Sequence, residues 1–352
     1  MDHATDTSVV PGQGGREGGC SFLEATVASI MMLLLAWLIA TLSVDGMRAQ
    51  RFAERTARVT EIAQDVIDDM RRGLGSAVRV FGSDLVGSAY RDTILLGAQM
   101  PAPVASSRLP LVVASAMLDL EDPALPRTGN ELFFARYAWT DEFTTTSANS
   151  YRVDVYRLER WYLTNAGAGP REGMPDGLNL SRWISEPLAD GSQVDRIEDA
   201  TDRAEVLTHL FAGTPDATGV ARDPVEVAWL VGEPPATTGT FRALDSSGGL
   251  SLTAPSNRPG GWRIMPSTRL SDPDILIYRH HSVSTNFAPG VFGVGRFGIL
   301  DLADGFPHGL EVQVVGTAAS RKILLHLSIC STLGGGRRAY HDMQVVVDVR
   351  DL

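Results

Sequence analysis

The chain has 352 residues and a formal net charge of −11 at pH 7. Hydrophobic residues make up 44% of it and charged residues 21%, which is enough to build a sizeable core. The acidic balance argues against nucleic acid as a partner, because phosphates repel such a surface. Only two cysteines are present, Cys20 and Cys330, and this excludes a disulfide framework and a four-cysteine zinc site. Nothing in the composition points to a cofactor.

An apolar segment near the N-terminus carries the strongest signal. Residues 1–19 are polar and rich in glycine, and residues 25–44 contain no charge, proline or glycine. As a helix, this run spans about 30 Å, the thickness of a bilayer core. A soluble helix that is buried on all sides is the alternative. A secretory signal peptide fits less well, because the run is longer than such peptides have and its leader is poor in basic residues. The pattern predicts a transmembrane helix over residues 20–44.

The residues at the start of this segment form a recognisable motif. Gly19-Cys20-Ser21-Phe22-Leu23-Glu24 resembles the prepilin-type cleavage and methylation site of type IV pilins and type II secretion pseudopilins. The resemblance implies that a prepilin peptidase removes residues 1–19, that Cys20 becomes the methylated N-terminus, and that Glu24 meets this amine on a neighbouring pilin or pseudopilin subunit. Phenylalanine is commonest at the new N-terminus, so Cys20 is a departure. Alternatively, Glu24 is an ordinary first-turn residue that is favoured by the helix dipole.

The resemblance also implies a topology, and the charges oppose it. A pilin-like protein lies in the inner membrane as a single-pass protein with its C-terminal head in the periplasm. Four arginines follow the apolar run (Arg48, Arg51, Arg55 and Arg58), whereas only Arg16 precedes it. The positive-inside rule would place the C-terminal side in the cytoplasm.

The helix continues as an amphipathic segment, for which we expect bounds of 45–96. Apolar residues spaced by three or four define one face: Val59, Ile62, Val66, Met70, Leu74, Val78, Phe81 and Leu85. Gly73 and Gly75 weaken the helix and favour a kink or an end there. Such a stripe predicts a sheet packed across it. Residues 63–80, with Asp69-Met70-Arg71-Arg72, loosely resemble the larger minor pilins and the J-type minor pseudopilins.

The remaining residues, 97–352, predict a β-rich head, so the fold class is α+β, pilin-like. Strand patterns occupy residues 132–139, 151–162, 225–231, 261–265 and 274–278. Three further runs, 310–315, 322–329 and 343–349, predict an antiparallel meander that covers the helix. Residues near 165–224 and 232–261 read as loop insertions with a short helix that ends near Phe211. Six aromatic residues are assigned to the core: Phe133, Phe134, Tyr137, Trp139, Trp161 and Tyr162.

Motifs for catalysis are weak. Residues 293–298 match G-x-G-x-x-G, but no buried strand precedes them and no long helix follows. His326 and His341 could lie on neighbouring strands without making a metal site. We therefore expect a structural subunit and not an enzyme. An unprocessed, membrane-anchored periplasmic domain that binds a ligand or partner is the alternative, and an anchored nucleotide-dependent enzyme is a third hypothesis.

Overall fold

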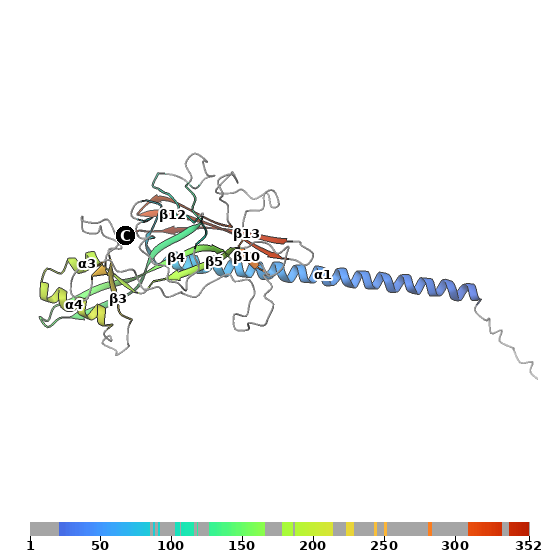
Figure 1. Cartoon of the computed structure of the whole chain (residues 1–352), viewed down its shortest axis with the longest axis horizontal. Coiled ribbons are helices and arrows are strands. Elements are labelled where there is room, and N and C mark those ends of the chain that lie inside the picture. The colour runs from blue at the N-terminus through green and yellow to red at the C-terminus, as the bar shows by residue number, and fades with distance from the viewer. Residues whose placement is uncertain are drawn as a thin grey trace, which may run out of the picture. The chain divides into compact units, whose positions relative to one another are not determined.

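The structure is a computed structural model, and its elements are drawn in Figure 1. It describes residues 21–84, 87–88, 91, 103–105, 107–115, 118, 127–165, 178–185, 187–213, 223–228, 243–244, 250–251, 281–283, 309–332 and 338–351. The chain divides within its first helix into two compact units, residues 1–54 and residues 55–352. The long helix is α1 (Phe22–Gly75). The expectation of one continuous helix through the apolar and amphipathic segments is confirmed.

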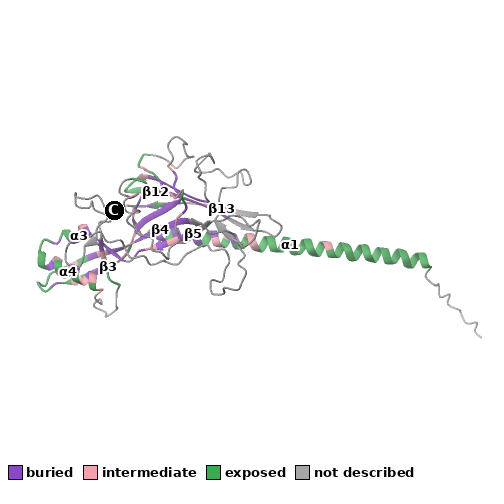
Figure 2. Cartoon of the chain, in the orientation of Figure 1, coloured by how far each residue is buried: buried purple, intermediate pink, exposed green. Residues whose placement is uncertain are grey.

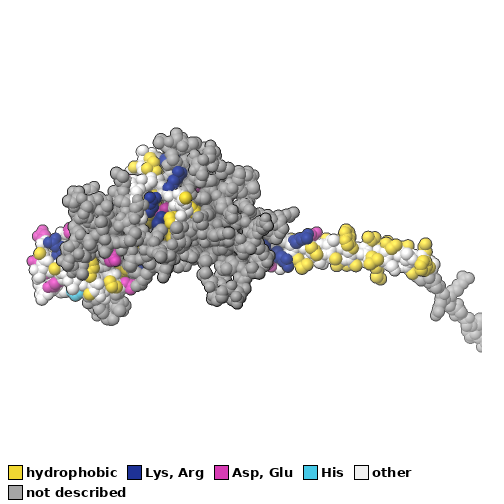
Figure 3. Space-filling view, viewed as in Figure 1, with side chains coloured by type: hydrophobic (Ala, Val, Ile, Leu, Met, Phe, Trp, Pro, Cys, Tyr) yellow, Lys and Arg dark blue, Asp and Glu magenta, His cyan; other side chains and the backbone are white. Residues whose placement is uncertain are grey.

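The first unit is described only as helix. From residue 21 to residue 54 every side chain is exposed except Thr41, which is half-buried. Figure 2 shows this part of α1 as exposed, and Figure 3 shows hydrophobic side chains along it. Among the described residues, α1 is the one helix that is long and apolar enough to cross a membrane.

The second unit is built on one large, mostly antiparallel sheet. Its strands are β1 (Ala77–Val80), β2 (Val112–Val113), β3 (Glu131–Thr144), β4 (Ser150–Asn165), β5 (Leu178–Ile184), β6 (Leu188–Asp190), β7 (Glu226–Ala228), β10 (His281–Val283), β11 (Leu310–Thr317), β12 (Ser320–Thr332) and β13 (Arg338–Val349). The order is β1-β3-β4-β5-β10-β12-β11-β2, with β13 also on β12, β6 on β4, and β7 on β6. Among the strands that the structure describes, β2–β11 and β6–β7 pair in parallel and the others antiparallel. A separate pair joins β8 (Ala243–Leu244) to β9 (Leu250–Ser251).

The predicted meander is confirmed. Strands β11, β12 and β13 pair antiparallel in sequence order, with Val312 opposite Leu325 and Leu325 opposite Val345. Alternate residues of these strands face α1, as the period of two requires. The expectation that the meander covers the helix stripe is therefore confirmed.

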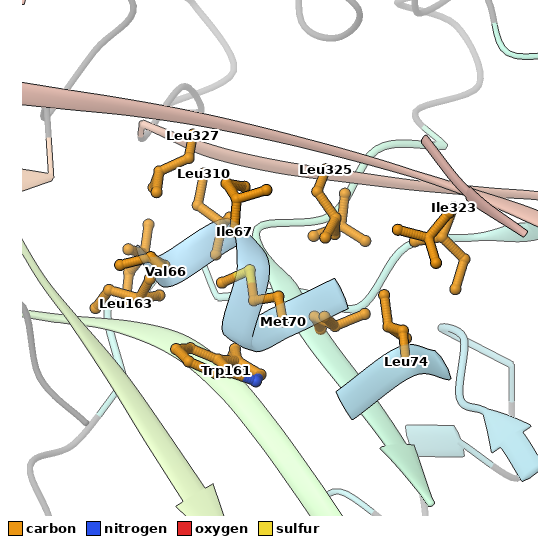
Figure 4. Close-up of a cluster of buried hydrophobic side chains, with 14 of the residues drawn as sticks. Val66, Ile67, Met70, Leu74, Trp161, Leu163, Leu310, Ile323, Leu325 and Leu327 are labelled. Carbon is orange, nitrogen blue, oxygen red and sulfur yellow. The ribbon is translucent and has the colours of Figure 1, made fainter. Parts of the chain in front are cut away.

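The end of α1 is enclosed more fully than the stripe alone implied. Its buried residues are Val59, Ala63, Val66, Ile67, Met70, Gly73 and Leu74, so a broad face is covered. Figure 4 shows Met70 between Trp161 of β4 and Leu325 of β12. A Cβ added at Gly73 would lie 2.9 Å from Cζ of Phe134 on β3, so the glycine permits close packing. The two halves of the sheet thus both contribute to one core around the helix.

Two expectations need correction. The helix does not extend towards residue 96, because α1 ends at Gly75 and the chain turns into β1, which pairs with β3. Val78 lies on that strand and Phe81 directly follows it; both join a second apolar cluster with Phe133 and Trp183. Apolar residues at this spacing satisfy a helical period over a short stretch, and the pairing with β3 decides the outcome. Leu85 lies outside the described residues.

The segment 165–224 is also not simply a loop insertion. Strand β5 pairs with β4, and its residues Leu180 and Trp183 are fully buried. Helices α3 (Gly191–Asp195) and α4 (Ala200–Ala212), together with β6 and β7, pack against the C-terminal part of β3 and the N-terminal part of β4. The buried side chains between these elements form a third apolar cluster. The Asp199 side chain caps the N-terminus of α4, and Gly213, with a left-handed φ of 58°, caps its C-terminus. We call this group of elements, residues 188–213 and 223–228, the α4 lobe.

Of the other strands and core residues expected from the sequence, some are confirmed, some lie outside the described residues and one is wrong. Strands β3, β4 and β7 contain or overlap the runs expected at 132–139, 151–162 and 225–231. Residues 261–265 and 274–278 lie outside the described residues. Of the six aromatic residues assigned to the core, four are fully buried and Trp139 is partly buried, but Tyr137 is 41% exposed.

Candidate functional site

The candidate site at the start of α1 centres on Glu24. The Glu24 side chain accepts a hydrogen bond from the backbone N–H of Ser21 at 2.9 Å, and Ser21 Oγ accepts one from the Glu24 N–H at 3.2 Å. This reciprocal pair is a capping box, which satisfies two N–H groups that the first helical turn leaves without partners. Both side chains are exposed. Gly19 and Cys20 lie outside the described residues.

Ser21 is a site residue that the sequence reasoning missed. The signal was available, because Ser-x-x-Glu directly before an apolar run is typical of a helix start. The capping box places the beginning of α1 two residues after the predicted cleavage point. In the capping box the Glu24 carboxylate has a hydrogen-bond partner within its own chain, without a neighbouring subunit.

Three side-chain hydroxyls inside the apolar segment are hydrogen-bonded in a way that suits the hydrocarbon core of a membrane. Thr26 Oγ1 donates to the carbonyl oxygen of Phe22 at 2.7 Å, and Ser29 Oγ donates to that of Ala25 at 2.8 Å. The Thr41 hydroxyl lies within hydrogen-bond distance of two carbonyl oxygens of the preceding turn. Each of these hydroxyls therefore bonds to its own helix, as a lipid-facing side chain requires.

In the second unit, a buried ionic cluster joins α1 to the sheet. Arg182 of β5 donates to Asp69 Oδ2 of α1 at 3.0 Å and to Glu159 Oε1 of β4 at 2.9 Å. Glu159 is fully buried and also accepts from Trp161 Nε1 at 2.8 Å and pairs with Arg136 at 2.9 Å. We call these five residues the latch cluster. A buried carboxylate with several cationic donors holds its partners in one geometry.

The latch cluster explains the Asp69-Met70-Arg71-Arg72 motif without a ligand. Asp69 enters the cluster, Met70 is fully buried in the core, and the two arginines are exposed. Arg72 forms an ion pair with Asp69 at 2.6 Å. Two residues of the motif, Asp69 and Met70, therefore join the end of α1 to the sheet.

The α4 lobe is fastened to the turn between β3 and β4. Asp202 Oδ2 accepts from Asn149 Nδ2 and from the Tyr151 hydroxyl, each at 2.7 Å. These hydrogen bonds favour the carboxylate and lower the pKa of Asp202 to about 2. Thr146 donates from its backbone and its side chain to Glu205, and this lowers the pKa of Glu205 as well.

A polar hollow of about 450 Å³ lies between β4 and α3. Gln193 of α3 links the two elements. Its Oε1 accepts a hydrogen bond from the Asp154 N–H at 2.9 Å, and its Nε2 donates one to the Tyr156 hydroxyl at 3.1 Å. Burial, aided by the nearby Asp154 charge, raises the pKa of Tyr156 to about 12, so its hydroxyl stays protonated. Among its lining residues, the Ser192 hydroxyl donates a hydrogen bond to the Asp190 carboxylate.

The two histidines singled out in the sequence are on neighbouring strands but are not brought together. His326 of β12 lies 2.9 Å from Glu311 Oε2 through Nδ1, and its cross-strand partner is Gln344. His341 of β13 lies opposite Ile329, with Nδ1 3.5 Å from Thr60 Oγ1. Within the described ranges, no group of three or more metal-ligating side chains is present. Residues 293–298 lie outside those ranges.

Comparisons with protein-family models, with curated proteins and with solved structures returned no match.

Proposed function

We propose that the chain is a pilin-like structural subunit, a minor pilin or pseudopilin of a type IV pilus or type II secretion system. The observation that carries the proposal is the form of α1, which begins at Phe22 within the Gly19–Glu24 motif. This one helix combines an exposed apolar segment with a C-terminal part enclosed by an antiparallel sheet. A membrane segment that later packs against like helices needs such exposure, and a head that must stay attached needs the buried end.

In this proposal the chain is inserted in the inner membrane with the second unit in the periplasm. A prepilin peptidase removes residues 1–19, and Cys20 becomes the N-terminus. Other pilin or pseudopilin subunits are then the partners of the apolar segment. The work is assembly, and the chain is a substrate of the peptidase and not an enzyme.

The test is the intact mass and N-terminal sequence of the membrane-extracted protein, with and without a co-expressed prepilin peptidase. Loss of residues 1–19 only when the peptidase is present supports the proposal. Gly19→Ala should block the cut, whereas Gly18→Ala, one residue earlier, should leave it intact. An uncut chain in both samples would overturn the pilin-like route.

The role of Glu24 in assembly has a test of its own. A capping box accepts glutamine in place of glutamate, but an ionic contact with an N-terminal amine needs the carboxylate. Glu24→Gln should therefore keep the helix start and lose co-assembly with partner subunits. Ser21→Ala should do the reverse. Equal co-assembly of wild type and Glu24→Gln would assign Glu24 to the cap alone.

The second candidate is an unprocessed, single-pass anchored domain that binds an envelope ligand or partner. The capping box favours it, because the box accounts for Glu24 without a neighbouring subunit. The polar hollow beside α3 offers such a domain a place for a ligand. An intact leader on the mature protein would select this candidate.

A further inference from the structure

The first two of the four arginines that follow the apolar segment, Arg48 and Arg51, are exposed. Arg48 is 76% exposed and forms an ion pair at 3.3 Å with Asp45, which is itself 71% exposed. Arg51 is exposed and has no ion pair or hydrogen bond to any of the residues that the structure describes. An exposed pair such as Arg48–Asp45 is weak, because solvent and salt screen it. Both guanidinium groups are therefore available to another anion.

The positions of these arginines on α1 are suited to a membrane surface. They are three residues apart, so they share one helix face. Along the helix axis they lie about 6 Å and about 10 Å beyond Val44, the last residue of the uncharged run. The headgroup layer of a bilayer is roughly 5–8 Å thick on each side. Long arginine side chains reach back towards that layer while their stems cover apolar surface.

We propose that Arg48 and Arg51 bind the phosphate groups of anionic phospholipids in the leaflet on the C-terminal side of the apolar segment. The guanidinium fork matches two phosphate oxygens, which makes arginine a suitable residue for such a contact. A lipid with net negative charge is favoured over a zwitterionic one, because no headgroup cation competes with the arginines. The inference rests on the part of the proposed function in which α1 spans a bilayer, and it does not require cleavage or assembly.

The same contact explains why Arg48 and Arg51 can lie on a side of the membrane that the positive-inside rule disfavours. In the proposed topology these residues face the periplasm, where the rule disfavours them. Headgroup phosphates neutralise such charges at the membrane surface. The contact then sets the depth of α1 in the bilayer, because it ties a fixed point on the helix to the headgroup layer.

The experiment uses the full chain in detergent micelles that contain equal amounts of phosphatidylglycerol and phosphatidylcholine. Retained lipids are counted by native mass spectrometry at two salt concentrations. One arginine near an anionic surface contributes roughly a fivefold preference. The wild type should therefore retain phosphatidylglycerol in at least about fivefold excess, and the excess should fall at high salt.

Two double variants make the test specific. Arg48→Gln with Arg51→Gln should bring the lipid ratio close to one. The matched control, Arg58→Gln with Arg71→Gln, removes the same charge from exposed positions about 20 Å or more beyond Val44 on α1. It should leave the ratio at the wild-type value. Because all four side chains are exposed, near-ultraviolet circular dichroism should show the same fold in every variant.

Equal retention of the two lipids by the wild type would overturn the proposal. An equal loss of preference in both double variants would overturn it as well, because net charge alone would then explain the binding. The uncut and the cleaved chain should give the same lipid ratio. A failure of peptidase processing is thus separate from a failure of lipid binding.

Discussion

The latch cluster gives the sharpest prediction about stability. Replacing Arg182 by methionine removes the cation that joins Asp69 of α1 to Glu159 of β4. Arg182 is 17% exposed and Glu159 is fully buried. Breaking a buried ion pair on one side costs about 3–5 kcal/mol, because the remaining charge loses its compensation. Arg136 still pairs with Glu159 at 2.9 Å, so we expect the lower end, about 3 kcal/mol.

The matched control is Arg152→Met in the exposed Arg152–Glu142 pair. Its side chains are 73% and 71% exposed, so the loss should be at most about 0.5 kcal/mol. The assay is thermal unfolding of the full chain in detergent, followed by near-ultraviolet circular dichroism of the buried tryptophans. For a unit of this size, the loss in Arg182→Met corresponds to roughly 5 °C. Equal melting temperatures for the two variants would refute the reasoning.

Three further predictions concern the core, the helix start and the α4 lobe. Met70→Ala opens a cavity between the helix and the sheet and should lower the free energy of unfolding by about 2–5 kcal/mol, measured by chemical denaturation; an unchanged midpoint would contradict the enclosure of α1. Ser21→Ala removes half of the capping box and should cost about 1 kcal/mol at the helix start, seen as faster amide exchange in the first turn only. The pKa of Asp202 is lowered to about 2 in the folded chain, so the carboxylate stabilises the α4 lobe above about pH 4, and this contribution is lost as the pH falls through 2. Asp202→Asn should therefore destabilise the lobe at pH 7, and its deficit in amide protection should shrink towards pH 2; a constant deficit would contradict this linkage.

Local patterns in the sequence were enough to predict the elements with long, regular signals. The apolar run and the stripe after it predicted one continuous helix, and α1 extends from Phe22 to Gly75, short of the expected bound at residue 96. Three alternating runs predicted the meander, and the strands pair as expected. In both cases the period extends over many residues, so it distinguishes helix from strand.

Other features depended on contacts between residues that are far apart in the chain. Strand β1 follows α1 with apolar residues that continue the helical spacing, and only its pairing with β3 makes it a strand. Strand β5 and the α4 lobe lie in a segment rich in glycine, proline and acidic residues, where the composition resembles a loop. Their burial against β3 and β4 depends on neighbours that no local pattern identifies.

At the candidate site, too, some features follow from the local sequence and others from contacts between distant residues. The sequence alone determined the residues around the predicted cleavage point and the uncharged length of α1, because both are local properties of the chain. Only the tertiary structure decided that both halves of one sheet enclose the end of the helix, and that Arg182 of β5 fastens it through Asp69. These two residues are separated by more than a hundred positions, and a contact over that distance is chosen by the free energy of the whole core.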